Sequence, residues 1–278
     1  MICRHFFIKF SCLFSFLILK AQSINGQDLI FSQYYNSPLH LNPAFAGTTN
    51  YPQFTANYRL QWPKFNNVYK TYAVTYDQFF KKMNSGIGFI AISDDQGEGT
   101  LKTTKFAGVY SYRAKFNDDW QIKMGLELGY HQTRIDWSRL VFFDQIDQFE
   151  GPFNSMGAPF PTSEVQPQNL NNGFLDVNFG MLLYSPRFYI GASLDHINGP
   201  YAGFTQNMGQ GFSESLPVLY TMNAGFQIVL QSDNKGNPST FISPNALFAI
   251  QSGFSQLNFG AYLQVRQLFG GIWMRHTI

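Results

Sequence analysis

The sequence predicts an all-β protein, a transmembrane antiparallel β-barrel whose strands follow one another in up-and-down order. Apolar and polar residues alternate in many segments, as side chains of a strand with two different faces do. Most of these segments have about ten to twelve residues, which exceeds the usual globular strand and matches a tilted membrane strand. Short connections also alternate with long ones, as in outer-membrane barrels.

Residues 1–26 have the layout of a secretory signal peptide. Arg4 and Lys9 precede an apolar core from Phe10 to Leu19, and small and polar residues follow. Because Lys20 ends the apolar run well short of a spanning helix, we expect cleavage near residue 26. An uncleaved anchor helix is the alternative interpretation.

Signal removal changes two properties of the chain. Cys3 and Cys12 leave with the signal, so no disulfide, thiol nucleophile or cysteine metal ligand is expected in the mature protein. The full chain has 19 basic and 17 acidic residues, and the loss of Arg4, Lys9 and Lys20 leaves 16 basic residues against the same 17. The alkaline pI is therefore no evidence for a nucleic-acid partner.

Residues 27–50 form a separate N-terminal segment, and residues 51–278 form the barrel domain. The segment contains Pro38 and Pro43 and has no clean alternation, yet it is too apolar for a free linker. We expect it to pack at the periplasmic mouth or inside the lumen. An ordered lead-in that makes only local contacts is the alternative.

The stretch Trp120–Tyr130 has the clearest strand pattern. Met124 and Leu126 lie on the apolar parity, whereas Lys123 and Glu127 lie on the polar one. In a soluble sandwich the apolar face would meet a protein core, and in a membrane barrel it would meet lipid. Strand length and loop pattern favour outer-membrane lipid as the contact.

The alternation predicts about eleven strands, at residues 53–62, 68–79, 85–93, 105–116, 120–134, 174–185, 187–197, 220–231, 240–251, 257–266 and 268–278. Single-chain bacterial barrels have even strand numbers. The count is odd and the last strand runs to the end of the sequence, so we expect C-terminal strands to be missing.

The longest external loop contains a candidate partner-binding strip. With the N-terminus in the periplasm, residues 135–172 face the exterior, where loops often bind partners. The strip comprises Leu140, Val141, Phe142, Phe143, Asp144, Asp147 and Glu150. An extra hairpin or a fold-back plug is equally compatible. Its acidic residues could bind calcium, although a solvated loop is the default expectation.

Charged residues on the polar parity form a candidate lumen lining, made up of Arg59, Asp77, Lys105, Arg113, Lys123 and Glu127. Such a mixed-sign set could hold a plug in place, line a weakly selective channel, or form ion pairs without further function.

No pattern of catalytic residues, metal ligands or cofactor motifs stands out. The mature histidines are scattered singly, and no G-x-S-x-G, P-loop or dinucleotide motif occurs. We expect neither an enzyme nor a bound metal or cofactor.

The start of the mature chain resembles the PorP/SprF family of type IX secretion outer-membrane proteins. The matching residues are Asp28, Phe31, Ser32, Gln33, Tyr34, Leu41, Asn42, Pro43, Ala44, Phe45, Ala46 and Gly47. The resemblance continues through residues 270–276, but the family's later segments do not occur here. Three further strands would give fourteen.

This resemblance implies an outer-membrane docking platform that serves type IX secretion. Its partners would be periplasmic and outer-membrane components of the machinery and a large secreted cargo such as an adhesin, in gliding relatives at the cell surface. A porin or a channel for hydrophobic substrates is the alternative function.

Overall fold

The computed structural model describes residues 28–64, 68–117, 119–149, 151–204, 215–233 and 238–277. Twelve antiparallel strands in these ranges form one sheet. They are β1 (Gln53–Gln61), β2 (Tyr69–Phe80), β3 (Ser85–Gln96), β4 (Leu101–Lys115), β5 (Gln121–Ile135), β6 (Asn171–Tyr184), β7 (Phe188–Asp195), β8 (Leu219–Phe226), β9 (Ile228–Ser232), β10 (Pro238–Gln251), β11 (Phe254–Val265) and β12 (Leu268–Thr277). The predicted all-β, up-and-down fold is confirmed.

All eleven predicted segments are strands, and one of them is divided. The segment expected at 220–231 is interrupted at Gln227, which separates β8 from β9, and both parts pair with β10. The Gln227 backbone N–H donates to the Arg187 carbonyl at 2.7 Å instead of joining the ladder with β10. The strand count is therefore twelve rather than eleven within the described ranges.

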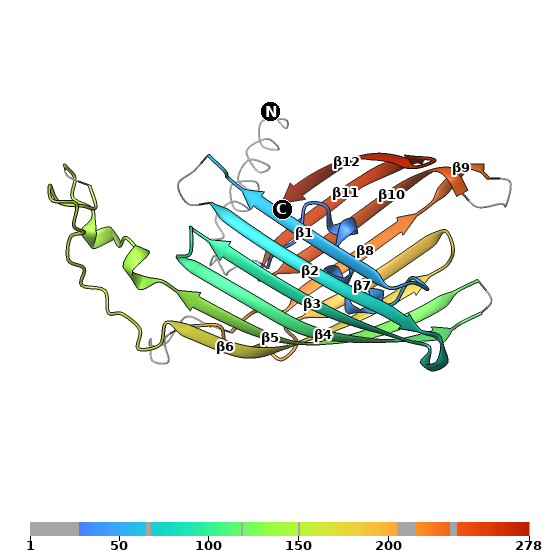
Figure 1. Cartoon of the computed structure of the whole chain (residues 1–278), viewed down its shortest axis with the longest axis horizontal. Helices are drawn as coiled ribbons and strands as arrows, with labels where there is room; N and C mark the ends of the chain where they lie inside the picture. The colour runs from blue at the N-terminus through green and yellow to red at the C-terminus, as the bar shows by residue number, and fades with distance from the viewer. Residues whose placement is uncertain are drawn as a thin grey trace, which may run out of the picture.

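The sheet curls back on itself, with the dark-blue N-terminal segment inside the curl (Figure 1). Neighbours in sequence are neighbours in the sheet from β1 to β8, and β10, β11 and β12 complete the order. Within the described ranges no pairing joins β1 to β12, so the sheet curls as a barrel does without closing.

The two faces of the sheet differ as the alternation predicts. On β5, Leu126 and Leu128 are 51% and 56% exposed on the outer face, whereas Lys123 and Glu127 are buried on the inner face. The apolar side chains therefore point away from the interior of the protein. The polar side chains point into it.

Helices contribute little to the fold. In the described ranges they are η1 (Tyr34–Asn36), α2 (Pro38–Leu41), η2 (Pro43–Phe45), η3 (Lys81–Met83), η4 (Trp137–Arg139) and η5 (Phe143–Gln145). Each is a turn of three or four residues, so none has the length or hydropathy of a membrane span.

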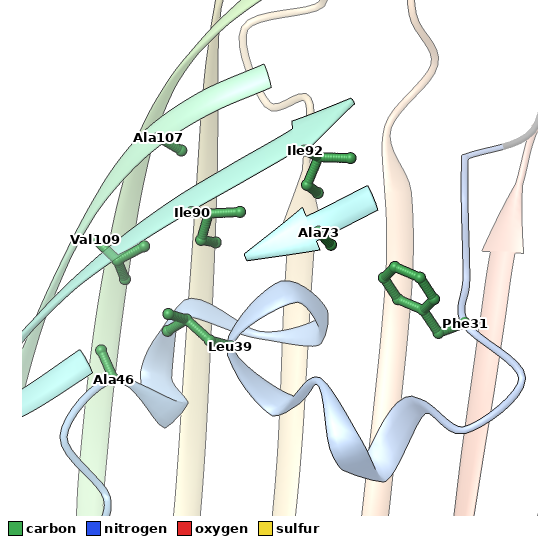
Figure 2. Close-up of a cluster of buried hydrophobic side chains, with 8 residues drawn as sticks. All are labelled: Phe31, Leu39, Ala46, Ala73, Ile90, Ile92, Ala107 and Val109. Atoms are coloured by element: carbon green, nitrogen blue, oxygen red, sulfur yellow. The ribbon is translucent and has the colours of Figure 1, made fainter. Parts of the chain in front are cut away.

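The largest apolar cluster joins the N-terminal segment to the inner face of the sheet (Figure 2). Phe31, Leu39 and Ala46 come from the segment, and they pack against Ala73 of β2, Ile90 and Ile92 of β3, and Ala107 and Val109 of β4. Burying one such large side chain contributes about 1.5–3 kcal/mol. These strands therefore carry apolar residues on both faces where the segment covers them.

Candidate functional site

The candidate site is the interior of the curled sheet together with residues 28–47, which we call the inner segment. Its turns follow from local sequence: Pro38 and Pro43 each begin a short helix, where a missing N–H costs nothing. Asn42 caps the second of these helices, because its side-chain oxygen accepts from the Ala44 N–H at 2.8 Å. The segment is thereby compact enough to fit inside the sheet.

Glycines on the inner face let the inner segment approach the strands closely. A Cβ at Gly86 of β3 would collide with the Ala46 carbonyl, and a Cβ at Gly125 of β5 would collide with the backbone of Pro43 and Ala44. A Cβ at Gly180 of β6 would collide with the Asn42 side chain. These positions were not identified from the sequence, although an inward-facing glycine inside a strand is a known sign of close backbone approach.

Hydrogen bonds hold the middle of the inner segment against β6 and β7. The Asn42 side chain donates to the Met181 carbonyl of β6 and to the Ala192 carbonyl of β7, both at 3.0 Å. The Ser193 hydroxyl donates to the Leu41 carbonyl at 3.0 Å. Asn42 is fully buried, so its amide binds two neighbouring strands in the absence of competing water.

Charged side chains hold the end of the inner segment. The Lys123 ammonium and the Ser111 hydroxyl both donate to the Ala46 carbonyl, the latter at 2.7 Å. The Gly47 N–H donates to the Asp77 carboxylate at 2.6 Å. Lys123 and Asp77, two of the predicted inner charges, thus bind the backbone of the segment.

A buried network holds the start of the inner segment. The Asp28 carboxylate accepts from His196 Nε2 at 2.6 Å and from the Gln251 amide at 2.7 Å. His196 Nδ1 lies 2.8 Å from the Asp176 carboxylate. One imidazolium therefore bridges two carboxylates from distant parts of the chain.

The pKa values of this network follow from its contacts. Burial by itself lowers the pKa of His196, but hydrogen bonds to Asp176 and Asp28 outweigh burial and raise it to about 10. Burial raises the pKa of Asp28, but His196 and Gln251 outweigh it, so the net shift is downward. His196 is therefore protonated at neutral pH and donates through both ring nitrogens.

The remaining predicted inner charges also point into the sheet. Lys105 forms an ion pair with Glu127 at 2.6 Å, and Glu127 accepts from Asn178 at 3.0 Å. The Arg113 guanidinium lies 3.8 Å from the centre of the Phe79 ring. Arg59 donates to Gln61 at 2.6 Å.

The inner segment separates two cavities. One of about 700 Å³ lies toward the ends of β1, β3 and β7, and one of about 450 Å³ lies toward their beginnings. Tyr34 and Leu41 line both cavities. The larger cavity is at the same end of the sheet as the long loop between β5 and β6.

Most of the recognised N-terminal motif is packed inside the sheet. Phe31, Tyr34, Asn42, Pro43, Ala44 and Gly47 are buried, whereas Ser32 and Gln33 are exposed. The Tyr34 ring packs edge-on against Trp273 of β12 with a centroid distance of 5.3 Å. The motif thus supplies packing and capping residues to the interior of the sheet.

The predicted partner-binding strip lies in the loop that leaves β5 and extends away from the sheet in Figure 1. Val141 and Phe143 are exposed, the latter by 93%, while Leu140 and Phe142 are half-buried. Asp144 and Asp147 are exposed, and Glu150 lies outside the described residues. No described residue of 136–170 lines the larger cavity, so this part of the loop does not fold back as a plug.

The acidic residues of the loop organise its backbone. The Asp144 carboxylate accepts from the Ser163 N–H at 2.6 Å and from the Ser163 and Thr162 hydroxyls. Among the described residues, no group of three or more histidine, cysteine, aspartate or glutamate side chains is arranged to hold a metal ion.

Sequence reasoning placed Asp28 in the recognised N-terminal motif, but it missed Asp176 and His196 as site residues and did not connect the three. They stand 148 and 20 residues apart along the chain, and each looked isolated. For Asp176, the alternation along the sequence indicates only that its side chain points to the inner face of the sheet. Contacts across the sheet bring the three together.

Comparison with known families gives one match. The family model described as type IX secretion system membrane protein PorP/SprF matches residues 23–277, which is nearly the whole chain. The curled, up-and-down sheet is consistent with a membrane barrel of that family. The comparison with curated proteins found no match.

Proposed function

Because the chain belongs to the PorP/SprF family of type IX secretion system membrane proteins, we propose that it is an outer-membrane docking platform rather than an enzyme. In this role it holds a particular secreted protein, such as a large adhesin, at the cell surface. Its other end meets periplasmic components of the secretion machinery. The signal peptide of residues 1–26 directs it to that membrane.

The outer face of the sheet supports the membrane assignment. Large apolar side chains are exposed there on many strands, including Phe89 of β3, Phe106 of β4, Leu128 of β5 and Leu175 of β6. An exposed apolar surface of this extent is unfavourable in water and favourable against acyl chains.

The exposed apolar side chains of the 136–170 loop carry the docking proposal. Phe143, Phe149 and Met156 are 93%, 95% and 90% exposed, and they project from the end of the sheet opposite the start of β1. Aromatic and methionine side chains are enriched where proteins bind one another. We expect this loop to contact the secreted partner.

A double substitution tests the loop. Phe143→Ser with Phe149→Ser removes two apolar contacts, and co-purification of secreted proteins from outer membranes, measured by mass spectrometry, should fall about tenfold or more. The matched control is Gln148→Ser with Glu164→Ser, which changes two exposed polar residues of the same loop. Unchanged co-purification by the phenylalanine variant, with the protein still in the membrane, would contradict the proposal.

The inner segment argues against the porin alternative. It lies between the two cavities and is hydrogen-bonded to β2 on one side of the curled sheet and to β10 on the other, so it blocks a direct path through the interior. The full-length chain should show no steady current in planar bilayers, and deletion of residues 29–46 should produce one. A steady current from the unaltered chain would favour a pore.

A further inference from the structure

Two arginines face the larger cavity, and neither is in ion-pair contact with a carboxylate of the described residues. Arg59 of β1 and Arg275 of β12 both line the cavity of about 700 Å³. In the part of the chain that the structure describes, neither guanidinium forms an ion pair with a carboxylate within 4.0 Å. The two cations repel each other, and an anion bound between them would relieve this repulsion.

Both guanidinium groups have hydrogen-bond donors to spare. Arg59 donates to Gln61, and Arg275 donates to the Asn258 side chain at 2.7 Å and to the Phe31 carbonyl at 3.4 Å. A guanidinium has five N–H donors, so most of them remain available to a ligand.

Gln256 adds a third, independent donor. It lies on β11, is only 7% exposed, and lines the same cavity. Among the residues that the structure describes, its side-chain nitrogen has no hydrogen-bond partner. Buried polar groups are normally paired, so an unpaired amide nitrogen in the same cavity as two guanidinium groups with spare donors points to a ligand that accepts hydrogen bonds.

The charges on this wall leave one positive charge uncompensated. Asp94 also lines the cavity and attracts Arg59, while its oxygens accept from Thr71 at 2.5 Å and Gln96 at 2.8 Å. On the wall formed by β1, β3 and β12, two guanidinium groups and one carboxylate give a net charge of +1, while Asp195 of β7 lines the cavity elsewhere. Nearby, Lys105 is paired with Glu127, and Asp28 is bound to His196.

We propose that Arg59, Arg275 and Gln256 bind the carboxylate of a ligand in this cavity. A carboxylate accepts from guanidinium groups in a planar, two-bond arrangement, and its single charge matches the single charge of the wall. A doubly charged phosphate would bring a second negative charge toward Asp94. Trp62, Tyr69 and Phe254 line the same cavity, so an apolar body next to the carboxylate is favoured.

The cavity volume lies in the range of small-molecule sites, which also fits the end of a peptide. The ligand is therefore a small carboxylic acid with an apolar group or a polypeptide with a free C-terminal carboxylate. The site does not depend on the proposed docking by the 136–170 loop, because it uses none of the described residues of that loop.

Calorimetric titration of the full chain in detergent tests the site. The probes are N-acetylphenylalanine and its amide, which differ only in the carboxylate, and inorganic phosphate. We expect the acid to bind at least tenfold more tightly than the amide and than phosphate. Arg59→Gln and Arg275→Gln should each weaken binding of the acid about tenfold and leave binding of the amide unchanged.

Arg187→Gln is the matched control, because Arg187 is an exposed arginine at the opposite end of the sheet, and it should bind the acid as the unaltered chain does. Circular dichroism verifies that each variant keeps its β-sheet.

Equal binding of acid and amide, tighter binding of phosphate, or unchanged binding by both arginine variants overturns the proposal. A phenylalanine-ending tripeptide identifies the source: tighter binding than the small acid indicates a chain terminus, and weaker binding indicates a small acid.

Discussion

Single residues of the inner segment connect parts of the sheet that are far apart in sequence. Asn42 caps a helix with its oxygen and binds β6 and β7 with its nitrogen, so all of its hydrogen-bonding groups are used. Asp28 accepts from a residue that follows β7 and from the last residue of β10. Residues of the recognised N-terminal motif therefore anchor the inner segment inside the sheet.

Asn42→Ala should destabilise the protein by about 1–3 kcal/mol, because it removes a cap and two buried hydrogen bonds at once. The measurement is the unfolding midpoint in guanidinium chloride, in detergent. Asn36→Ala is the control, since Asn36 is exposed and, within the described ranges, its side chain bonds only to Gln33. Equal midpoints for the two variants would show that Asn42 does not anchor the segment.

The start of the inner segment should loosen as pH rises from about 6.5 to 10. The folded pKa of His196, about 10, exceeds its ordinary value of 6.5, so its stabilising contribution is complete below 6.5 and is lost as His196 deprotonates. The pKa of Asp28 is lowered, so its contribution is present above 3.8 and is lost in acid. Hydrogen-exchange protection at residues 29–31, measured relative to the intrinsic exchange rate at each pH, should therefore be highest between these limits.

His196→Asn tests this assignment. His196 has a backbone φ of +61°, which asparagine tolerates better than most residues. The variant should show less exchange protection than the unaltered chain at pH 6 and little further change in protection up to pH 10. An unaltered alkaline dependence in this variant would assign the effect to another group.

At the scale of elements, the strands and the inner segment are matched by shape. Inward-facing glycines on β3, β5 and β6 leave room for the backbone of the inner segment, and apolar residues of β2, β3 and β4 receive Phe31 and Leu39. The segment therefore contributes to the core of the sheet as well as obstructing its interior.

Gly125→Val should displace the inner segment, because a side chain there occupies the position of Pro43 and Ala44. We expect a loss of about 1–3 kcal/mol or more and faster proteolysis between residues 28 and 47. Gly108→Val on the neighbouring strand is the matched control, since a Cβ at Gly108 meets nothing within 4 Å. Equal protection in both variants would contradict the close contact.

At the scale of the whole molecule, the sheet has an apolar exterior and a polar, largely occupied interior. This is the reverse of a soluble sandwich, in which apolar faces meet each other. Charged residues are only 13% of the chain. Those on the outer face of β2 to β5, namely Lys70, Asp95, Lys102 and Arg134, lie next to one another near the strand ends and leave the middle of that face uncharged. Contact of the outer face with lipid therefore accounts for the low share of charged residues in the chain.

Leu128→Arg should cost about 2–4 kcal/mol, because Leu128 lies on the outer face near the middle of β5, where the bilayer is driest. Gln132→Arg is the control on the same face near the strand end, and its cost should be about 0–1 kcal/mol. Unfolding in lipid vesicles measures both. Equal costs would indicate that this face does not meet lipid.

Sequence alone determined the strands and the face that each residue occupies, because a period of two is a local property of the backbone. It also indicated that Lys123 and Asp77 point inward, because successive side chains on a strand alternate between the outer and the inner face of the sheet. Only the tertiary structure decided what these residues contact: that Lys123 binds the Ala46 carbonyl, that His196 joins Asp28 to Asp176, and that Gly125 makes room for Pro43. Such contacts join residues more than a hundred positions apart in some cases, and they depend on how the sheet curls, which alternation does not specify.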